Sequence, residues 1–550
     1  MHGMPVLRPA SKLPAMFKTN CRLHRWRIGA AALLLSGLAA WMPAHAAQGL
    51  PSSNVAWVPA AQDADVDRAF ARAKAEGKPL LLYWGAAWCP PCNQLKATLF
   101  NRQDFAAQAR QFVAVHVDGD RPGAQKLGAR FHVVGYPTVI LFTAGGAEIS
   151  RLPGEADAPQ VMALLQAGLA GGRPIKAVLA DARAGKPLAA NEWRMLAFHS
   201  WDTDEAQLVP AGDRAALLAE LARLSERPGS APDNETTTRL WLKALAASDD
   251  GKGIKPDAAL RERLQRVLAD PALARIQMDV LVNNADDIVK LMTPEMSPER
   301  DALVARFDAA LLRLQADTTL SRGDRVSALI SRVNLARLTG KDDAVQVSLP
   351  EPLLREVRET SARMDREISD GYERQAVITA VAYLQGRAGL WADSDALLKG
   401  NLARSHSPYY LMSQLGGNAR KQGHKDEALR WYAMAFERSE GPATRLQWGS
   451  SYLSALVELA PAEAGRIERT AAQLFDEASR DKGAFYERSA RSLQRVGNKL
   501  QAWNKGGSQA AAITRLQGQL DGLCRKVEAA DGQRARCQAL LKPAAQPGAG

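Results

Sequence analysis

The order of hydrophobic and polar positions predicts an α/β domain in the first third of the chain. Apolar side chains recur at helical spacing over 63–76, and Gly77 and Pro79 end that helix. Short apolar or β-branched runs typical of buried strands then alternate with further helical patterns. The expected strands cover 80–84, 112–117, 138–142 and 148–152, and the expected helices cover 63–76, a stretch through Phe105, and 157–169. This alternation predicts one α/β domain over residues 55–172.

The pattern changes beyond residue 175, where strand-like runs end and helical spacing continues. Segments rich in Ala, Leu, Arg and Glu each present one apolar face, as over 214–224 and 373–384. We therefore expect residues 175–542 to form a large all-helical region. The last residues, 543–550, are rich in Pro, Ala and Gly and are expected to be a disordered tail.

A period of 34 residues is visible in the helical region, over 380–480. Gly389 and Gly423 are 34 positions apart, and so are Pro408 and Pro442. This is the period of the tetratricopeptide repeat, a helix–turn–helix unit that stacks into a solenoid. The segment resembles that repeat. This resemblance implies that a protein partner binds to a concave helical surface. A helical bundle with chance self-similarity is the alternative.

The first 46 residues are predicted to be a secretory signal peptide. They hold six basic residues and no acidic one, and a short apolar run over 28–42 precedes the pattern Ala44–Ala46. A basic start, an apolar segment too short to span a bilayer and a small-residue cleavage pattern are typical of such signals. The alternative, an uncleaved membrane anchor, requires a longer apolar run. The prediction for residues 1–46 implies a periplasmic or secreted protein that contacts the membrane only during export.

The basic charge of the chain does not indicate nucleic-acid binding. Of the formal net charge of +12, half belongs to the predicted signal peptide, which leaves +6 for the remaining 504 residues. No run of Lys and Arg with interleaved aromatic residues occurs in that part. Export also implies an oxidising compartment, in which the four cysteines outside the signal peptide can form disulfides.

Cys89 and Cys92 form the strongest chemical motif of the chain. They are separated by two residues and stand directly after an expected strand, at the start of an expected helix. The unpaired N–H groups and the positive dipole end of a helix favour a thiolate, so Cys89 is predicted to be the nucleophile. Cys92 lies one turn further on and is expected to attack the mixed disulfide that Cys89 forms. Pro90 and Pro91 fit the first helical turn.

Zinc binding is the competing interpretation of this spacing, and the rest of the chain does not support it. A structural zinc site needs about four ligands, but Cys524 and Cys537 are far away in sequence and no histidine pair has a suitable spacing. No metal and no cofactor is therefore expected. Cys524 and Cys537 flank a turn pattern over 529–532 and are predicted to form a structural disulfide across a helical hairpin. A second redox pair is the alternative, without a local motif in its favour.

Residues 55–170 resemble a thioredoxin-like domain. The resemblance rests on Trp88 before the two cysteines and on Tyr136-Pro137-Thr138 further along the chain. It implies that Pro137 is a cis-proline that faces the dithiol, shapes the substrate groove and keeps metal from the thiols. It also implies that Trp88 and Tyr136 contact the substrate, with the backbone of Tyr136 pairing with a bound peptide.

The segment 77–89 looks most like the secreted thioredoxin-like domains related to the C-terminal domain of the bacterial membrane disulfide reductase. That resemblance implies such a reductase as the electron donor. The chain departs from thioredoxin at Tyr83, where the family has a buried aspartate that helps to move a proton from the second thiol. A tyrosine is a poor base near neutral pH. The two prolines between the cysteines, in place of Pro-His, favour a reductase over a strong oxidant.

These observations predict an exported thiol–disulfide oxidoreductase that reduces or exchanges disulfides in periplasmic proteins through Cys89 and Cys92. The expected partners are disulfide-containing exported proteins, a membrane disulfide reductase and a protein held by the helical repeats. The predicted fold is an α/β thioredoxin fold followed by an all-α, partly tetratricopeptide-like solenoid. In the alternative hypothesis the helical region is an adaptor or assembly platform, and the thioredoxin-like domain is a secondary binding or regulatory module.

Overall fold

The computed structural model describes residues 55–542 except for short internal gaps. The gaps are 155, 205–206, 231–232, 249–252, 339 and 341–344. The predicted signal peptide, 1–46, and the predicted disordered tail, 543–550, lie outside the described residues and stay predictions. Within the described part, none of the helices combines the length and the apolar character needed to cross a bilayer.

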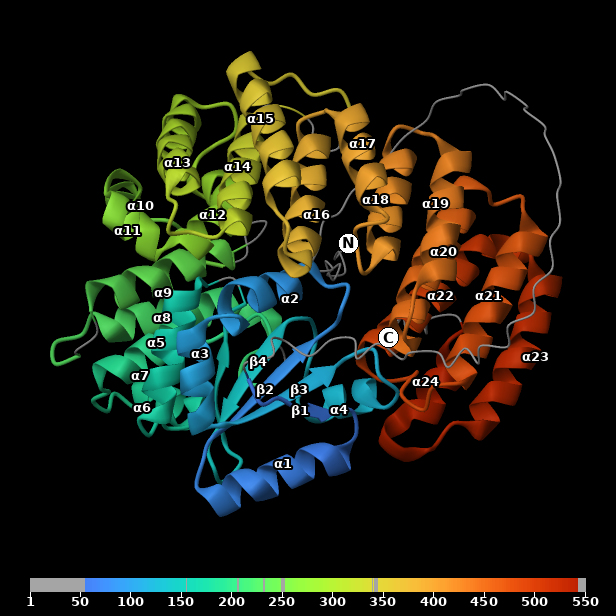
Figure 1. Ribbon diagram of the computed structural model, residues 1–550, viewed down its shortest axis with the longest axis horizontal. Coiled ribbons are helices and arrows are strands. Elements are labelled where there is room, and N and C mark those ends of the chain that lie inside the picture. The colour runs from blue at the N-terminus through green and yellow to red at the C-terminus, as the bar shows by residue number, and fades with distance from the viewer. Residues whose placement is uncertain are drawn as a thin grey trace, which may run out of the picture.

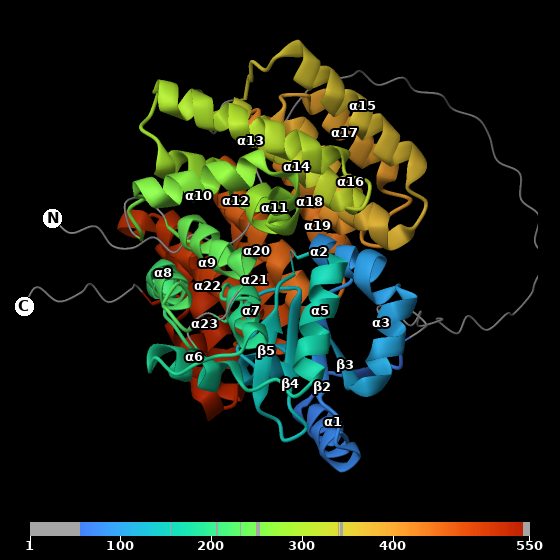
Figure 2. The ribbon, with the colours of Figure 1, turned by 90° about the vertical axis from the view of Figure 1, so that its left-hand side faces the viewer.

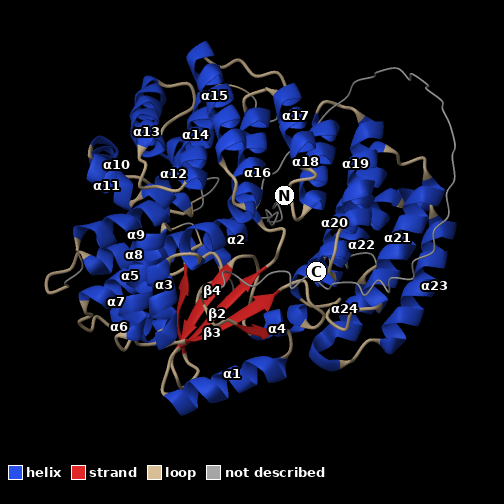
Figure 3. Ribbon diagram, viewed as in Figure 1, coloured by secondary structure: helices blue, strands red, loops and turns tan. Residues whose placement is uncertain are grey.

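A five-stranded sheet forms the centre of the N-terminal domain (Figure 1, Figure 3). Its strands are β1 (Val58–Ala60), β2 (Leu80–Gly85), β3 (Val113–Asp118), β4 (Thr138–Phe142) and β5 (Glu148–Leu152). They lie in the order β1-β3-β2-β4-β5, with β1, β3 and β2 parallel and with β4 antiparallel to both β2 and β5. The sequence pattern predicts four of them and misses β1, because three residues with a proline at the centre show no alternation.

Helices cover both faces of the sheet, in the arrangement of a thioredoxin fold. One face carries α1 (Asp63–Glu76) and α4 (Ala124–Arg130), and the other carries α2 (Pro90–Leu95) and α5 (Ala158–Leu169). Successive residues of β2 point to opposite faces, so Leu82 joins the core under α1 and α4 while Tyr83 joins the core under α2. The predicted α/β fold is confirmed.

The helix expected to run on from the two cysteines is divided. Its pieces are α2, a π-helical turn η1 (Lys96–Phe100), α3 (Gln103–Gln108) and a short 3₁₀ turn η2 (Ala109–Gln111). The buried side chains explain the division, because Leu95, Phe100 and Phe105 recur every five residues and are all in the core. A regular α-helix with 3.6 residues per turn does not keep that spacing on one face, whereas a π turn adds the extra residue.

Beyond residue 175 the described chain contributes helices and no further strand to the sheet, so the predicted all-helical region is confirmed there. The α-helices are α6 (Ile175–Arg183), α7 (Ala190–Phe198), α8 (Arg214–Ser225), α9 (Asn234–Ala246), α10 (Ala258–Ala269), α11 (Pro271–Ile276), α12 (Met278–Met292), α13 (Pro298–Ala316), α14 (Arg322–Ala336), α15 (Glu351–Glu367), α16 (Gly371–Arg387), α17 (Trp391–Asn401), α18 (Pro408–Lys421), α19 (Lys425–Arg438), α20 (Pro442–Leu459), α21 (Ala464–Ser479), α22 (Glu487–Trp503), α23 (Ala510–Lys526) and α24 (Gln533–Ala539). Three 3₁₀ turns, η3 (Ala211–Asp213), η4 (Lys505–Gly507) and η5 (Ala530–Gly532), complete the region.

The 34-residue period coincides with a series of helix pairs. α18 and α20 begin 34 positions apart, at Pro408 and Pro442. Gly389 and Gly423 precede the second helix of successive pairs, α17 and α19, and both have a positive φ, 78° and 83°. Glycine adopts this backbone conformation without a Cβ clash, which accounts for its recurrence at the turn. The tetratricopeptide-like character of these pairs stays a prediction.

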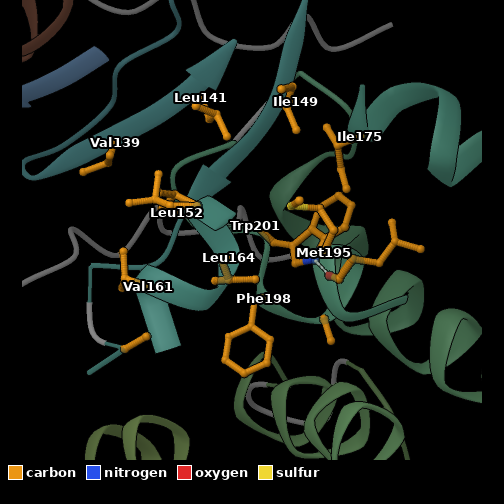
Figure 4. Close-up of a cluster of buried hydrophobic side chains, with 14 of the residues drawn as sticks. Val139, Leu141, Ile149, Leu152, Val161, Leu164, Ile175, Met195, Phe198 and Trp201 are labelled. Carbon is orange, nitrogen blue, oxygen red and sulfur yellow. Dashed lines mark hydrogen bonds between the residues drawn. The ribbon is translucent and has the colours of Figure 1, made fainter. Parts of the chain in front are cut away.

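The largest hydrophobic core spans the junction between the sheet and the helical region (Figure 4). Leu141 of β4 and Leu164 of α5 belong to it, together with Ile175, Phe198 and Trp201 from the chain beyond the domain, and all five side chains are buried. The first helices of the helical region therefore share a core with the thioredoxin-like domain.

The helical region curves around the N-terminal domain, as two perpendicular views show (Figure 1, Figure 2). In Figure 1 the green, yellow, orange and red helices surround the blue domain on three sides, whereas α1 lies on the free edge. α16 contacts α2, and α22 contacts α4. In this arrangement the inner side of the helical arc is occupied by the chain's own thioredoxin-like domain.

Candidate redox site

Cys89 and Cys92 are joined by a disulfide at the N-terminus of α2. Cys89 is the N-cap residue. The backbone N–H of Cys92 donates a hydrogen bond of 3.2 Å to the sulfur of Cys89. Pro90 and Pro91 take the first helical positions, where the missing N–H groups have no helical partner to lose. In the reduced state a thiolate at Cys89 would face the same N–H and the positive end of the helix dipole. The site therefore stabilises the charged form of this sulfur.

Both cysteine side chains are buried, with 2% of Cys89 and none of Cys92 exposed. Asn93 fixes the loop in front of the helix, because its side-chain amide donates to the carbonyl of Ala87 at 2.7 Å and to that of Cys89 at 2.8 Å. Cys92 is thus the more enclosed of two sulfurs that are both held in place.

Trp88 is covered by side chains from the helical region. Its ring stacks on Tyr410 of α18, with ring centres 5.9 Å apart and planes 17° apart. It meets Trp448 of α20 edge to face, also at 5.9 Å. The guanidinium of Arg488 of α22 lies 4.7 Å from the same ring, a cation–π distance. The aromatic side chain next to Cys89 is therefore partly buried between the redox domain and the helical region.

A hydrogen-bond network joins the same two parts of the chain. The indole N–H of Trp88 is shared between a carboxylate oxygen of Asp120 and the hydroxyl of Thr444, both at 2.9 Å. Arg488 donates to the Thr444 hydroxyl at 3.0 Å and lies 3.5 Å from Asp120. The backbone N–H of Arg488 also donates to the side-chain oxygen of Gln125 at 3.0 Å. Helices α20 and α22 are in this way bound to the turn after β3.

The peptide bond between Tyr136 and Pro137 is cis, directly before β4. The Tyr136 ring packs against the two cysteines, and its hydroxyl accepts a hydrogen bond of 2.7 Å from Gln125. Burial raises the pKa of Tyr136 above its ordinary value. Pro137 lies against Gly154, where a Cβ would come within 3.2 Å of the proline ring. The loop with the cis-proline therefore lies beside the Cys89–Cys92 disulfide, as the resemblance to thioredoxin-like domains implies.

Tyr83 lies in the core under α2, and among the described residues its hydroxyl has no hydrogen-bond partner. Its ring stacks on His116, with centres 5.0 Å apart and planes 15° apart. Burial raises the pKa of Tyr83 far above its ordinary value and lowers that of His116 to about 3. Both side chains are neutral near pH 7, so neither accepts a proton there.

Lys96, which is buried, and Asp118, which is half-buried, are ionisable groups that no motif in the sequence indicates. The backbone N–H of Lys96 bonds to the carbonyl of Cys92, one helical turn away, and only 2% of the lysine is exposed. Its ammonium lies 4.9 Å from the ring of Tyr372 of α16. Burial lowers the pKa of Lys96 to about 8, against the attraction of Asp118. Burial and the charge of Asp120 raise the pKa of Asp118 to about 6.

Cys524 and Cys537 form a second disulfide, between positions 13 apart. Cys524 lies in the last turn of α23, and Cys537 lies in α24. Both are buried in an apolar core that includes Leu516, Leu520 and Leu540. This disulfide links the consecutive helices α23 and α24. The described residues next to these two cysteines include no proline and no tryptophan like those beside Cys89.

The structure brings the redox residues named from the sequence into one place, and it adds residues from far along the chain. The side chains that cover Trp88 carry no local signal, since aromatic residues at helical spacing look like ordinary core. The added residues are Lys96, Asp118, Tyr410, Thr444, Trp448 and Arg488. The described chain contains no group of three or more potential metal ligands.

Comparisons with known proteins agree with this geometry. Residues 66–169 match a family model described as a thioredoxin-like domain. Thiol:disulfide interchange protein DsbD 2 of Pseudomonas aeruginosa is 34% identical over 120 residues, which are 21% of this chain and 20% of that protein. DsbD 1 of the same organism is 33% identical over 116 residues, and DsbD of Cronobacter sakazakii is 35% identical over 99 residues. The matches span about a fifth or less of the length of these relatives.

Among solved structures, the solution structure of a thioredoxin from Thermus thermophilus is 26% identical and covers 22% of this chain and 90% of its own, with a TM-score of 0.20. The sheet order, the CxxC disulfide and the family match define residues 66–169 as a thioredoxin-like domain. More specifically, the domain is homologous to the thioredoxin-like domains of the DsbD proteins. These findings support thiol–disulfide oxidoreductase chemistry.

Proposed function

We propose that this protein is an exported thiol–disulfide oxidoreductase that reduces or exchanges disulfides in periplasmic proteins. The observation that carries the proposal is the position of Cys89 at the N-cap of α2, with the N–H of Cys92 directed at its sulfur. Such a sulfur readily forms a thiolate, which is the form that attacks disulfides. Similarity to DsbD domains supports exchange with disulfide-bearing proteins. Export rests on the signal peptide predicted from the sequence.

The proposed reaction moves two electrons from the dithiol to a substrate disulfide. The Cys89 thiolate attacks one substrate sulfur, so a mixed disulfide forms and the other substrate sulfur leaves as a thiolate. Cys92 then loses its proton and attacks the sulfur of Cys89, which releases the second substrate thiolate. The Cys89–Cys92 disulfide is the oxidised product, and the substrate dithiol gains the electrons and two protons.

Repeated turnover requires a reductant for the Cys89–Cys92 disulfide. We propose a membrane disulfide reductase as this donor, by similarity to the DsbD proteins. A thiol pair of the donor would attack Cys89 and run the same two exchange steps in reverse.

The proton of Cys92 needs an acceptor other than Tyr83, whose pKa is raised by burial. Lys96 and Asp118 are the candidates, with pKa values of about 8 and about 6. Between these values Lys96 holds its proton and Asp118 is ionised, so Asp118 is the member of the pair that accepts a proton near neutral pH. The charge of Lys96 lowers the pKa of Asp118, against the effect of burial.

The enclosure of Trp88 favours a second candidate function. Side chains of α18, α20 and α22 cover the indole, and Cys89 is almost fully buried. A redox domain held in this way would serve as a module of a helical adaptor or assembly protein, whose partner binds the helices. In that case the disulfide would regulate contacts of the adaptor, and no client sulfur would bond to Cys89.

A trapping experiment separates the two functions. Cys92→Ser leaves Cys89 able to attack but removes the sulfur that releases the client. The full chain with this substitution should accumulate mixed disulfides with exported proteins, visible as species that collapse on reduction. Cys89→Ser is the matched control and should trap none. A folded Cys92→Ser protein that traps no client contradicts the oxidoreductase proposal and supports the adaptor.

A further inference from the structure

Helix α22 carries a row of basic side chains on one face. Its basic residues, which we call the basic row, are Arg488, Arg491, Arg495 and Lys499. At 3.6 residues per turn these positions lie within about 80° of one another around the helix axis. No acidic residue follows Glu487 in this helix, whereas α13, α15 and α21 interleave acidic with basic residues. The charge along α22 is therefore confined to one sign and one face.

The C-terminal half of the basic row has no carboxylate partner within the described chain. Arg495 and Lys499 form no ion pair there, and the Arg495 guanidinium donates a hydrogen bond of 3.2 Å to the neutral hydroxyl of Ser450. Arg495 is exposed and Lys499 is half-buried. Desolvation by the surrounding helices and the charge of Arg491 lower the pKa of Arg495. A bound carboxylate would counter both effects, because an opposite charge favours the charged form.

A cavity of about 600 Å³ adjoins the N-terminal half of the row, and Arg491 lines it. It lies between α4 of the redox domain and the helices α22 and α24. Each acidic side chain of its wall already has a partner, and the pairs are Asp63–Arg130, Glu487–Arg491 and Asp531–Tyr486. Lys126 forms no ion pair with the described residues, and Arg536 donates to the backbone carbonyl of Phe485 at 3.2 Å. The cavity therefore holds two further cations without a carboxylate partner.

The row and the cavity adjoin the side chains that cover the redox site. Arg488, the first member of the row, lies 4.7 Å from the ring of Trp88 and 5.1 Å from that of Tyr136. Arg491 donates a hydrogen bond of 2.8 Å to the carbonyl of Val134, two residues before Tyr136. A partner that docks along α22 is in this way held beside the redox domain.

We infer that the basic row and this cavity form a docking surface for an acidic segment of a protein partner. The row extends over about 16 Å of helix, which matches about five residues of extended chain. Guanidinium groups bind carboxylates through paired hydrogen bonds, so spaced Glu or Asp side chains suit the row. Helix α22 lies beyond residues 380–480, so the inference is independent of the 34-residue period. It goes beyond the proposed oxidoreductase function and does not rest on it.

A polypeptide fits this surface better than a nucleic acid does. The cavity wall includes three acidic side chains, which would repel a continuous phosphate backbone. The basic row itself contains no aromatic residue on which a base could stack. The acidic side chains of a polypeptide, in contrast, are separated by neutral residues. Such a segment can therefore pair with the free cations and avoid the acidic groups.

The test measures the binding of fluorescent peptides to the oxidised full chain by anisotropy. One cysteine-free peptide alternates Glu with Ser, and a second has Gln in place of each Glu. The wild-type chain should bind the Glu peptide and not the Gln peptide, and added salt should weaken this binding because exposed charges are screened. Arg495→Gln with Lys499→Gln should weaken it about tenfold, the loss expected for two exposed ion pairs. Lys126→Gln with Arg536→Gln should weaken it by a similar factor.

Arg469→Gln with Lys425→Gln is the matched control, because it removes the same charge from exposed positions of α21 and α19 outside the row and the cavity. It should leave the affinity unchanged. Absence of binding to the Glu peptide by the folded wild-type chain overturns the inference, and so does an equal loss in the control and in the row variant. Tighter binding of a single-stranded oligonucleotide of equal charge also overturns it. Since the peptides lack cysteine and the chain stays oxidised, none of these outcomes contradicts the proposed redox function.

Discussion

The two disulfides of the described chain are almost equally buried, yet they lie at opposite ends of their helices. Cys89 caps the N-terminus of α2, where an N–H points at its sulfur, whereas Cys524 lies in the last turn of α23. The positive end of a helix dipole stabilises a thiolate and the negative end opposes it. Burial therefore does not distinguish the two disulfides of the described chain, whereas the helix end does.

The surroundings of the two disulfides also differ, since the first has an ionisable side chain nearby and the second lies in an apolar core. Lys96 lies one helical turn from Cys92, burial lowers its pKa to about 8, and a cis-proline loop adjoins the first pair. The second pair is surrounded by leucine side chains in the core of a helical hairpin. We expect the first disulfide to govern activity and pH dependence, and the second to govern stability.

Removal of the predicted nucleophile has the largest expected effect. Cys89→Ser should lower the rate of disulfide reduction by at least about 10³-fold, since a serine hydroxyl does not form the attacking anion. Single-turnover reduction of a peptide disulfide by the full chain measures this. The double variant Cys524→Ala, Cys537→Ala should keep the wild-type rate. If the second pair proves necessary for turnover and the first does not, the comparison is reversed.

Lys96→Met tests the energetic cost of the buried charge near the first disulfide. The pKa of Lys96 is about 8 in the folded chain and 10.5 as the ordinary value. Between those values the unfolded chain binds more protons, so the free energy of unfolding rises with pH across that window. Methionine should remove this rise and increase the free energy of unfolding at pH 7 by about 3 kcal/mol. Denaturant unfolding at pH 7 and pH 10 measures both effects, and a less stable variant at pH 7 contradicts the assignment.

Loss of the second disulfide should mainly reduce stability. Cys524→Ala with Cys537→Ala opens a link between positions 13 apart, and a loop of this length contributes about 3 kcal/mol in the chain-entropy model. The shorter loop between Cys89 and Cys92 should contribute less, so reduction of that pair alone should lower the melting temperature less. Thermal unfolding of the two oxidation states and of the double variant checks this order. A larger loss from the first pair would mean that the Cys89–Cys92 link is the structural one.

The smallest effect is expected where the helical region covers the first disulfide. Trp448→Ala removes one edge-to-face contact to Trp88, a contribution of about 1 kcal/mol. The reduced Cys89 should then react about fivefold faster with a bulky thiol reagent, because the closed arrangement is less favoured. Trp431→Ala, at a partly buried tryptophan of α19 that does not stack on Trp88, is the control. Equal rates in wild type and Trp448→Ala would show that the aromatic contact does not limit access.

The local motifs of the redox domain could be predicted from the sequence because they depend on neighbours along the chain. The two cysteines, the helix start and the cis-proline loop each have a signature a few residues long. Strand β1 could not be predicted from the hydrophobic pattern, because three residues are too few to show an alternation. The burial of Lys96 could not be predicted either, since a lysine is almost always exposed. Lys96 is buried because α16 packs over it.

The enclosure of Trp88 could not be predicted because it joins residues hundreds of positions apart. Thr444 meets Trp88, and Arg488 meets Asp120, only after the helical region has curved around the domain. In the sequence these positions resemble the rest of an amphipathic helix. The sequence predicts a concave helical surface for a protein partner, and this stays a prediction; in the structure α16 and α22 contact the redox domain.

The most direct test of the central claim is a glutathione redox titration of the folded full chain, with each cysteine's oxidation state read by alkylation and mass spectrometry. We expect Cys89 and Cys92 to exchange as a pair and to reach equilibrium with glutathione. Cys524 and Cys537 should stay oxidised under the same conditions until the chain is unfolded. Reduction of Cys524–Cys537 before Cys89–Cys92, or of both together, would contradict the distinction between a redox-active and a structural disulfide.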